Sequence, residues 1–316
     1  MNTADKINYE LRPAKYVERR LLLISLERII GYYKSTINAN YSYIGFGALA
    51  FTDFKLFHRE LGIKKMVSIE GGNYSSERLE LNKPYSCISI KKGTANEILP
   101  KLNFENQTIV WLDYDEHLQP YYFDDIHICT TKMNIGSILL ITCNTALQKG
   151  PKKDKQPLTD DEFRAEYNDL VPIDVGEHCC TSSKSAITIW KMFYNYCKNE
   201  LSERNMVNHE HLSFLPLYNF VYKDGTEMVT FGGVIVNEGT TIEKLNLPTL
   251  GFFGAGQCRI EFPNLTYRET MRLNQVLDNP KLERSQFIDT GILTQEELDN
   301  YKKFYKYMPN YFDVRL

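Results

Sequence analysis

The sequence predicts an α/β fold built on a doubly wound, mostly parallel sheet. Short apolar segments that suit strands alternate with segments of helical periodicity, as in parallel sheets covered by helices on both faces. A glycine-containing turn follows the first of these strands, and the dipeptide Asp224-Gly225 later marks an antiparallel hairpin that closes the sheet. The predicted parallel strands cover residues 41–46, 64–70, 86–90, 108–115 and 136–144.

Helical periodicity defines the elements around these strands. An N-terminal helix is expected over residues 13–34, because Pro13 suits a first turn and apolar residues then recur at helical spacing. Thr159 and Glu162 predict a capping box at the start of a helix that reaches about residue 170. Further helices are expected at residues 50–61, 74–82 and 184–203, and residues 91–102 are expected to form a turn followed by a helix.

The second half of the chain is less regular. Residues 148–160 contain two prolines and four lysines without periodicity, which predicts a mobile, solvated loop rather than a contact with an anionic substrate. Residues 216–236 form two strand-like runs around Asp224-Gly225, the predicted hairpin. Thr266 and Glu269 mark one more helix start.

Composition narrows the class of protein. The chain has 316 residues, 43% of them hydrophobic, so it can bury a large core. A net charge of −3 does not favour nucleic acid as a partner, although it does not exclude it. Without a signal-peptide core or an apolar run of roughly 20 residues, we expect a cytoplasmic protein with no membrane contact. Seven cysteines without a CxxC pair predict reduced thiols and no structural zinc site.

Two glycines and one acid point to a nucleoside-bearing ligand. Gly45, Phe46 and Gly47 connect the first predicted strand to its helix, where glycine lets the backbone turn sharply and approach a ligand. Glu70 ends the second strand, 23 positions after Gly47, where a carboxylate can bind both hydroxyls of a ribose. Because Ala50 extends the glycine pattern, a dinucleotide such as NAD also fits. A turn without a ligand, with Glu70 as a solvated cap, is the remaining alternative.

With these residues, the stretch 41–145 resembles class I S-adenosylmethionine-dependent methyltransferases, whose sheet is Rossmann-like. The segments LRPAKYVERR and IGFGALAFTDF resemble bacterial proteins described as putative O-methyltransferases. The chain departs from the family pattern at Tyr43, where an acid is usual, and at Leu49, where a glycine is usual. The resemblance implies that S-adenosylmethionine is the cofactor and that it is bound by Gly45, Phe46, Gly47, Glu70, Gly93, Thr94, Ala95 and Asp113.

The pattern along the chain, together with this resemblance to residues 41–145, divides the chain into three expected regions. Residues 1–40 form an N-terminal helical segment. Residues 41–239 form a Rossmann-like methyltransferase domain with an insertion at about 148–180. Residues 240–316 form a mixed, partly helical appendage that packs on the core.

Polar residues at the ends of the fourth and fifth strands are the candidate catalytic groups. Asp113 and Asp115 lie at the carboxyl edge of the sheet, where open α/β folds bind ligands and where an acid can take a proton from an acceptor hydroxyl. A solvated helix cap explains Asp115 equally well, and Tyr114 is expected to pack on the opposite face. Asn144 ends the fifth strand, where metal-dependent O-methyltransferases carry an Asp-Asn pair. Because Cys143 replaces the acid, no magnesium or calcium site is predicted.

Three further groups allow a functional and a structural interpretation. Residues 209–211, His-Glu-His, suggest a metal site, but a polar loop is favoured because no third ligand is evident. Residues 178–180, His-Cys-Cys, suggest a nucleophile, but bystander thiols are favoured. Arg12 and Lys15 fit either a clamp for an anionic ligand or surface salt links.

Methyl transfer to an oxygen or nitrogen of a small-molecule or nucleotide-like acceptor is therefore the leading functional hypothesis. An inactive, methyltransferase-like sensor or partner-binding module is the second, because of Tyr43 and Leu49. An NAD-dependent enzyme is the third. The sequence leaves open whether the chain forms a homo-oligomer or binds a protein partner.

Overall fold

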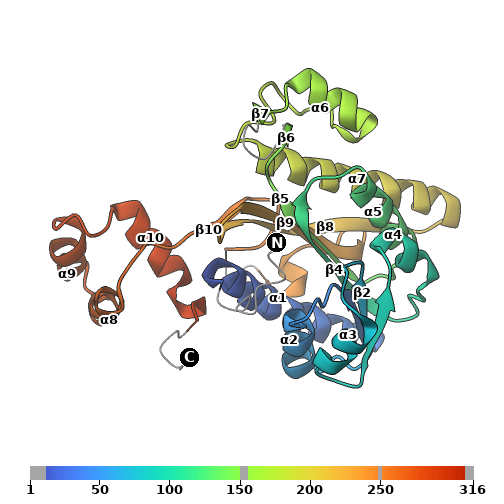
Figure 1. Ribbon diagram of the computed structural model, residues 1–316, viewed down its shortest axis with the longest axis horizontal. Coiled ribbons are helices and arrows are strands. Elements are labelled where there is room, and N and C mark those ends of the chain that lie inside the picture. The colour runs from blue at the N-terminus through green and yellow to red at the C-terminus, as the bar shows by residue number, and fades with distance from the viewer. Residues whose placement is uncertain (1–11, 150–155, 248–250, 310–316) are drawn as a thin grey trace.

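The computed structural model describes residues 12–149, 156–247 and 251–309 and shows a sheet between two layers of helices (Figure 1). The eight strands lie in the order β10-β8-β9-β5-β4-β1-β2-β3. β9 runs antiparallel to β5 and β8, and the remaining pairings in this sheet are parallel. The predicted fold, a doubly wound, mostly parallel sheet closed by an antiparallel hairpin, is confirmed. The strands are β1 (Tyr41–Gly45), β2 (Met66–Glu70), β3 (Ile88–Lys92), β4 (Gln107–His117), β5 (Ile138–Asn144), β8 (Leu212–Lys223), β9 (Glu227–Asn237) and β10 (Cys258–Ile260).

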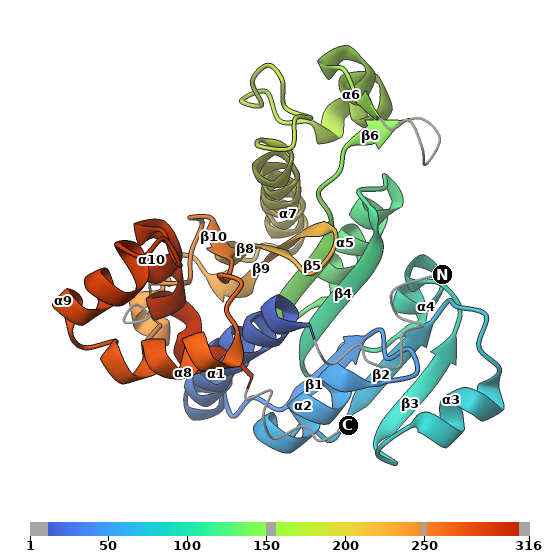
Figure 2. The ribbon, with the colours of Figure 1, turned by 60° about the vertical axis from the view of Figure 1, so that its left-hand side comes forward.

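Helices cover both faces of the sheet (Figure 2). α1 (Pro13–Ile37) and α2 (Thr52–Leu61) pack on one face, and α5 (Tyr121–Lys132) and α7 (Ser185–Asn208) pack on the other. No described helix combines the length and apolar character needed to cross a membrane. The shorter helices are α3 (Ser76–Asn82), α4 (Ala95–Ile98), α6 (Asp160–Tyr167), α8 (Tyr267–Val276), α9 (Pro280–Glu283) and α10 (Gln295–Phe304).

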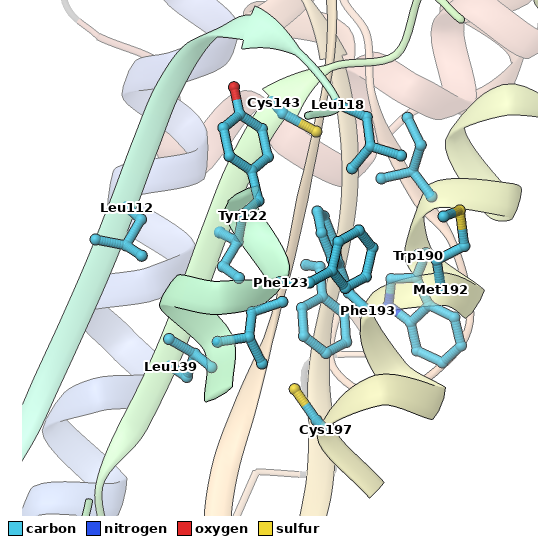
Figure 3. Packing of buried hydrophobic residues seen from close by; sticks show 14 of the residues in the cluster. Leu112, Leu118, Tyr122, Phe123, Leu139, Cys143, Trp190, Met192, Phe193 and Cys197 are labelled. Atoms are coloured by element: carbon cyan, nitrogen blue, oxygen red, sulfur yellow. The ribbon is translucent and has the colours of Figure 1, made fainter. Parts of the chain in front are cut away.

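The face under α5 and α7 holds a dense aromatic core (Figure 3). Phe123 of α5 lies 5.3 Å from Phe193 of α7, measured between ring centroids, and Phe193 lies 5.7 Å from Phe231 of β9. These rings are completely or almost completely buried. Burying large aromatic side chains on both sides of the helix–sheet contact fixes α5 and α7 on the sheet.

The opposite face is dominated by α1, which is buried on more than one side. It contacts β8 of the sheet, and it also contacts β10 and two short C-terminal turns, Glu243–Leu245 and Tyr305–Tyr307. The carboxylate of Asp224, in the β8–β9 turn, accepts hydrogen bonds from the backbone N–H groups of Ala14 (3.2 Å) and Lys15 (2.8 Å). The hairpin predicted from Asp224-Gly225 thus also caps the N-terminus of α1.

Several elements differ from the sequence prediction. The helix α5 was not predicted, because its sequence is rich in aromatic and β-branched residues, yet it is held by packing on the sheet. Residues 91–102 were expected to form a turn and a helix, and the helix is shorter than expected: Ala95–Ile98 is α-helical and is followed by a 3-10 turn at Leu99–Lys101. The ends of the expected loop 148–160 pair as a short ribbon of β6 (Gln148–Lys149) and β7 (Gln156–Pro157), while residues 150–155 lie outside the described part.

The C-terminal region contributes to the sheet and also has a small core of its own. Its strand β10 pairs in parallel with β8, and Phe304 at the end of α10 belongs to the large core beside α1. The separate cluster joins α8, α10 and the turn between them, and consists of Leu273, Val276, Phe287, Leu293, Leu298 and Tyr301. The sheet therefore extends beyond the hairpin into the region expected to be an appendage.

Asp125 makes the stability of this fold depend on pH. It accepts a hydrogen bond from Tyr114 (2.5 Å), and burial raises its pKa from 3.8 to about 6, against the lowering effect of that bond. Because the pKa of Asp125 is higher in the folded than in the unfolded protein, protonated Asp125 contributes fully to the free energy of unfolding below about pH 4. This contribution is lost as the pH rises through about 6. We expect Asp125→Asn to remove this loss. The free energy of unfolding of the variant, relative to that of the unmodified protein, should rise by roughly 2–3 kcal/mol between pH 4 and pH 7.

Denaturant unfolding at both pH values measures this difference. Other carboxylates titrate in both proteins and cancel in the comparison. A pH-independent difference between the two proteins would contradict the raised pKa of Asp125.

Candidate functional site

The carboxyl ends of β1 and β2 meet at the side chain of Glu70. Its Oε1 atom accepts hydrogen bonds from the backbone N–H groups of Gly47 (3.0 Å) and Ala48 (3.1 Å) and from the Ser68 hydroxyl (2.5 Å). Glu70 is buried, and burial raises its pKa, while these three hydrogen bonds lower it. The turn after β1 and the acid that ends β2, which the sequence predicts to act together, are therefore in direct contact.

Both glycines of the turn are required by packing within the protein. A Cβ atom on Gly45 would lie 2.3 Å from the Tyr43 hydroxyl. A Cβ atom on Gly47 would lie 2.5 Å from the Ser68 hydroxyl and 2.6 Å from the Phe51 ring. Protein atoms thus fill the space beside each Cα, so a valine at Gly47 would displace the turn itself as well as any ligand.

The third predicted cofactor element, residues 93–95, adjoins Glu70. The N–H of Gly93 donates to the carbonyl of Glu70 (3.2 Å), and Gly93 has a φ of +141° that other residues rarely adopt. Thr94 and Glu97 form a capping box at the start of α4, which holds the turn in place. Phe46 lies on the α5 side of the sheet, with its ring edge-on to Tyr114 at 5.3 Å between centroids. All the predicted cofactor residues therefore lie along the carboxyl edge of β1–β4.

Asp113, near the end of β4, is held by a buried lysine. The Lys15 ammonium lies 2.9 Å from Oδ1 of Asp113 and 2.9 Å from Oε2 of Glu18, and it donates to the hydroxyl of Tyr222 at 3.0 Å. It also lies 4.5 Å from the centroid of the Trp111 ring. The side chains of Lys15 and Glu18 are 1% and 0% exposed and that of Asp113 is 14% exposed. Asp113 is thus the member of this cluster that reaches the surface.

Glu18 continues the cluster into the sheet. Burial raises the pKa of Glu18 and the nearby Asp113 charge adds to this, while Lys15 opposes it. Thr230 of β9 donates a short hydrogen bond to Oε1 of Glu18, and its hydroxyl oxygen lies 2.8 Å from that of Thr142 in β5. Thr142 in turn accepts from the indole N–H of Trp111 (3.0 Å). These hydrogen bonds connect polar groups of α1, β4, β5 and β9 inside the core.

A second buried ion pair joins α1 to α2. Nε of Arg19 lies 2.6 Å from Oδ1 of Asp53, and both side chains are largely buried. Asp53 lies in the first turn of α2, so this pair ties the start of α2 to α1. Lys15 was expected to form either a ligand clamp or surface salt links. It does form ion pairs, with Asp113 and Glu18, but they are buried and not at the surface. Glu18 and Arg19 were not predicted from the sequence, although charged residues next to the buried Val17 and Leu21 of a helix could have indicated them.

The other predicted catalytic residues have different surroundings. Asp115 is exposed at the end of β4. Tyr114 faces the other way and stacks on Tyr122 at 3.8 Å between ring centroids, as expected for a packing residue. Oδ1 of Asn144 accepts from the N–H of Ala146 (2.8 Å), so its side chain shapes the turn after β5. Among the predicted catalytic residues, Asp113 is therefore the acid that is mostly buried and lies at the carboxyl edge of the sheet.

The structure also shows the surroundings of residues 178–180, the candidate nucleophile, and of residues 209–211, the candidate metal site. His209 ends α7 in a left-handed conformation, and Glu210 pairs with Arg204 at 2.7 Å. Cys179 and Cys180 are buried, and burial raises the pKa of both thiols. Because the thiolate is the nucleophile, this environment disfavours nucleophilic catalysis by either cysteine.

A cavity of about 660 Å³ lies beside the first turn of α1, a volume in the range of roughly 300–1,000 Å³ that is typical of ligand pockets. Its lining includes Tyr222, Asp224, Arg259, Phe262, Asn274 and Tyr301. Among the described residues, neither the glycine turn nor Glu70 nor Asp113 lines it. The cavity is therefore distinct from the predicted cofactor site, with Tyr222 linking it to Lys15.

Removing the buried lysine should destabilise the protein strongly. Lys15→Met leaves the carboxylates of Glu18 and Asp113 without this cation, and we expect a loss of about 3–5 kcal/mol in the free energy of unfolding. Adding Glu18→Gln should restore part of the loss. Lys191, which pairs with Asp174 at the surface at 2.6 Å, gives the matched control. Denaturant unfolding should show less than about 1 kcal/mol for Lys191→Met. Equal losses for Lys15→Met and Lys191→Met would contradict the role given to Lys15.

Comparison with solved structures finds distant likenesses, all with TM-scores below 0.5 among those described here. Trm1 from Pyrococcus horikoshii, solved with S-adenosyl-L-methionine, is 12% identical with a TM-score of 0.41 over 73% of this chain and 58% of Trm1. Cofactor-bound Rv0187 from MTB is 12% identical with a TM-score of 0.36 over 68% of this chain and 80% of Rv0187. A putative O-methyltransferase from Nostoc punctiforme is 8% identical with a TM-score of 0.34 over 66% of this chain and 55% of that protein. This chain thus spans less than two thirds of the length of Trm1 and of the Nostoc protein.

These likenesses are too distant to decide the family, and no curated protein matches the sequence significantly. The family is decided by a family model described as "Putative O-methyltransferase", which matches residues 7–316. Because this match spans nearly the whole chain, the protein belongs to that O-methyltransferase family, as the sequence resemblance predicted.

Proposed function

We propose that this protein binds S-adenosylmethionine at the carboxyl edge of β1 and β2 and transfers its methyl group to a small-molecule or nucleotide-like acceptor. The acceptor atom is an oxygen, as the family description favours, or a nitrogen. The observation that carries the proposal is the contact of Glu70 with the turn after β1, in a chain of an O-methyltransferase family. A carboxylate at the end of β2 could accept hydrogen bonds from the hydroxyls of a ribose, which supports the proposal.

The residues at this edge suit a nucleoside with an amino-acid tail. Glu70 is a buried carboxylate at the end of a strand, with the turn at Gly47 on one side and Gly93 on the other. Its Oε1 atom is held by backbone N–H groups, so ribose hydroxyls would exchange with or add to these hydrogen bonds. When bound, S-adenosylmethionine supplies an electrophilic methyl group.

Asp113 is the residue we assign to the acceptor. Lys15 holds its Oδ1 atom, which orients the carboxylate, while part of the side chain reaches the surface of the carboxyl edge. From this place Asp113 can hold an acceptor hydroxyl in line and accept its proton at a carboxylate oxygen. Glu18 and Tyr222, which also contact Lys15, fix the position of the ammonium.

A second candidate is a protein that binds the cofactor without turnover. Tyr43, which replaces the usual acid, is 1% exposed and packs between Phe54 and Phe57 at 4.7 and 4.9 Å between ring centroids. At this position the family's usual acid could contact a ligand, whereas Tyr43 of this chain packs in the core. The antiparallel pairing of β9 with β5 and β8 does not favour the third hypothesis, an NAD-dependent enzyme.

Cofactor binding tests the site first. Isothermal titration calorimetry with S-adenosylhomocysteine should give saturable binding, and NADH should give none. Glu70→Gln removes the charge at the ribose position and should weaken S-adenosylhomocysteine at least tenfold, about 1.4 kcal/mol. Glu80→Gln, on exposed α3, is the control and should bind as the unmodified protein does. NADH binding without S-adenosylhomocysteine binding would overturn the proposal, and an unchanged affinity in folded Glu70→Gln would overturn the assigned site.

Turnover tests the role of Asp113. Incubating the protein with methyl-labelled S-adenosylmethionine and a cell extract should label an acceptor, and Asp113→Asn should lower the rate roughly 100-fold or more, since it removes the proton acceptor. The S-adenosylhomocysteine affinity of this variant should fall by a smaller factor than the rate, because we assign Asp113 chiefly to the acceptor although it is also among the predicted cofactor residues. Cofactor binding without any labelling would instead favour the second candidate.

A further inference from the structure

The insertion between β5 and α7 brings three metal-ligand side chains together. Asp160 is the first residue of α6, and Cys179 and Cys180 lie in the turn before α7. The ligand atoms of these three residues all lie within 4.8 Å of one another. Asp160 is partly buried, and Cys179 and Cys180 are 2% and 4% exposed. None of these residues takes part in the proposed methyl transfer.

The distances within this triad match those of a tetrahedral zinc site. Two thiolates bound to zinc at about 2.3 Å in a tetrahedron lie about 3.8 Å apart, and a thiolate and a carboxylate oxygen lie about 3.5 Å apart. The sulfur atoms of Cys179 and Cys180 are 3.8 Å apart, and Sγ of Cys179 is 3.3 Å from Oδ1 of Asp160. One face of the tetrahedron is therefore nearly formed before an ion arrives.

Local hydrogen bonds hold the triad in this arrangement. Asp160 accepts from the backbone N–H groups of His178 (2.6 Å) and Cys179 (3.1 Å), so its carboxylate is fixed beside the thiols. Thr188 of α7 donates to the carbonyl of Cys179 (3.0 Å). His178 has a left-handed φ of 58°, which turns the chain before the two cysteines. Adjacent side chains that diverge in an extended chain converge here.

We propose that Asp160, Cys179 and Cys180 bind one zinc ion, with the fourth position open to water. Two sulfur ligands favour zinc over magnesium or calcium, which prefer oxygen ligands. Binding forms two zinc–sulfur bonds and one zinc–oxygen bond and releases the two thiol protons to solvent. The ion would tie the start of α6 to the start of α7. No structural zinc site was predicted from the sequence, because zinc-binding cysteines commonly occur as CxxC pairs and this triad contains none.

A zinc ion bound here would restrain the part of the insertion that lies next to the carboxyl edge of the sheet. The hydroxyl of Tyr167, at the end of α6, donates to the carbonyl of Leu118 (2.8 Å), just after β4. The guanidinium of Arg164 donates to the carbonyl of Val175 (2.7 Å) within the insertion. Fixing the start of α6 would therefore stiffen the insertion above the strand that carries Asp113. The binding of zinc does not depend on the proposed methyl transfer.

Cobalt and zinc titrations of the full chain test this site. The protein is stripped with 1,10-phenanthroline under a non-chelating reductant and titrated with cobalt chloride, whose thiolate charge-transfer and visible bands report tetrahedral sulfur ligation. We expect one equivalent of cobalt with both bands, and displacement of the cobalt by zinc chloride. Zinc affinity is measured by competition with a chromophoric chelator.

Three variants and one control decide the ligand set. Cys179→Ser and Cys180→Ser should each weaken zinc roughly 100-fold or more, and Asp160→Asn about tenfold, because the amide keeps an oxygen for the backbone N–H groups but loses the charge. Cys197→Ser, a buried cysteine of α7 outside the triad, should bind zinc as the unmodified protein does. If the serine variants do not fold, Asp160→Asn alone carries the comparison.

Four results would overturn the proposal. One is a reduced protein without the cobalt–thiolate band, and another is a band that survives the loss of both Cys179 and Cys180. The third is an equal loss of zinc affinity in Cys197→Ser. If a thiol titration of the denatured, unreduced protein shows two thiols missing and zinc fails to bind after reduction, the pair is a redox pair and the metal site is excluded.

Discussion

The buried ammonium of Lys15 is the interaction on which the rest of this structure depends. It joins two carboxylates, a phenol and an indole ring, which come from α1, β4 and β8. Removing a charge from water costs several kcal/mol unless opposite charges and hydrogen bonds replace the solvent, and all of these partners do so here. Because Glu18 extends the network to Thr230 in β9, a single helix orders four strands of the sheet through polar contacts.

This arrangement explains how an N-terminal helix becomes part of the candidate site. α1 is fixed at its N-terminus by Asp224 of the hairpin and along its length by the ion pair of Arg19 with Asp53. The helix therefore presents Lys15 to Asp113 from outside the alternating strand–helix unit. The contact of Glu70 with the turn after β1, where we propose that the cofactor binds, does not involve α1, because it is formed by hydrogen bonds between the ends of two neighbouring strands.

The two regions outside the strand–helix repeat both lie around the carboxyl edge. The insertion is anchored beside β4 by Tyr167 and contains the Asp160, Cys179 and Cys180 triad. The C-terminal region adds β10 to the sheet and forms a wall of the 660 Å³ cavity beside the first turn of α1. Each region thus adds a chemically distinct surface to the same edge of the sheet. This is expected where many proteins share one fold and differ in the loops and insertions that bind their ligands.

The sequence alone determined those structural elements that depend only on residues close together in the chain. The strands, the Asp224-Gly225 hairpin and the capping boxes at Thr159 and Thr266 follow from local periodicity, turn chemistry and side-chain-to-backbone hydrogen bonds. The tertiary structure alone decided that Lys15 meets Asp113, 98 positions away, and that Asp160 meets Cys179, 19 positions away. It also decided that α5 is a helix and that β10 joins the sheet. These features depend on burial and on contacts between distant segments, which no local pattern records.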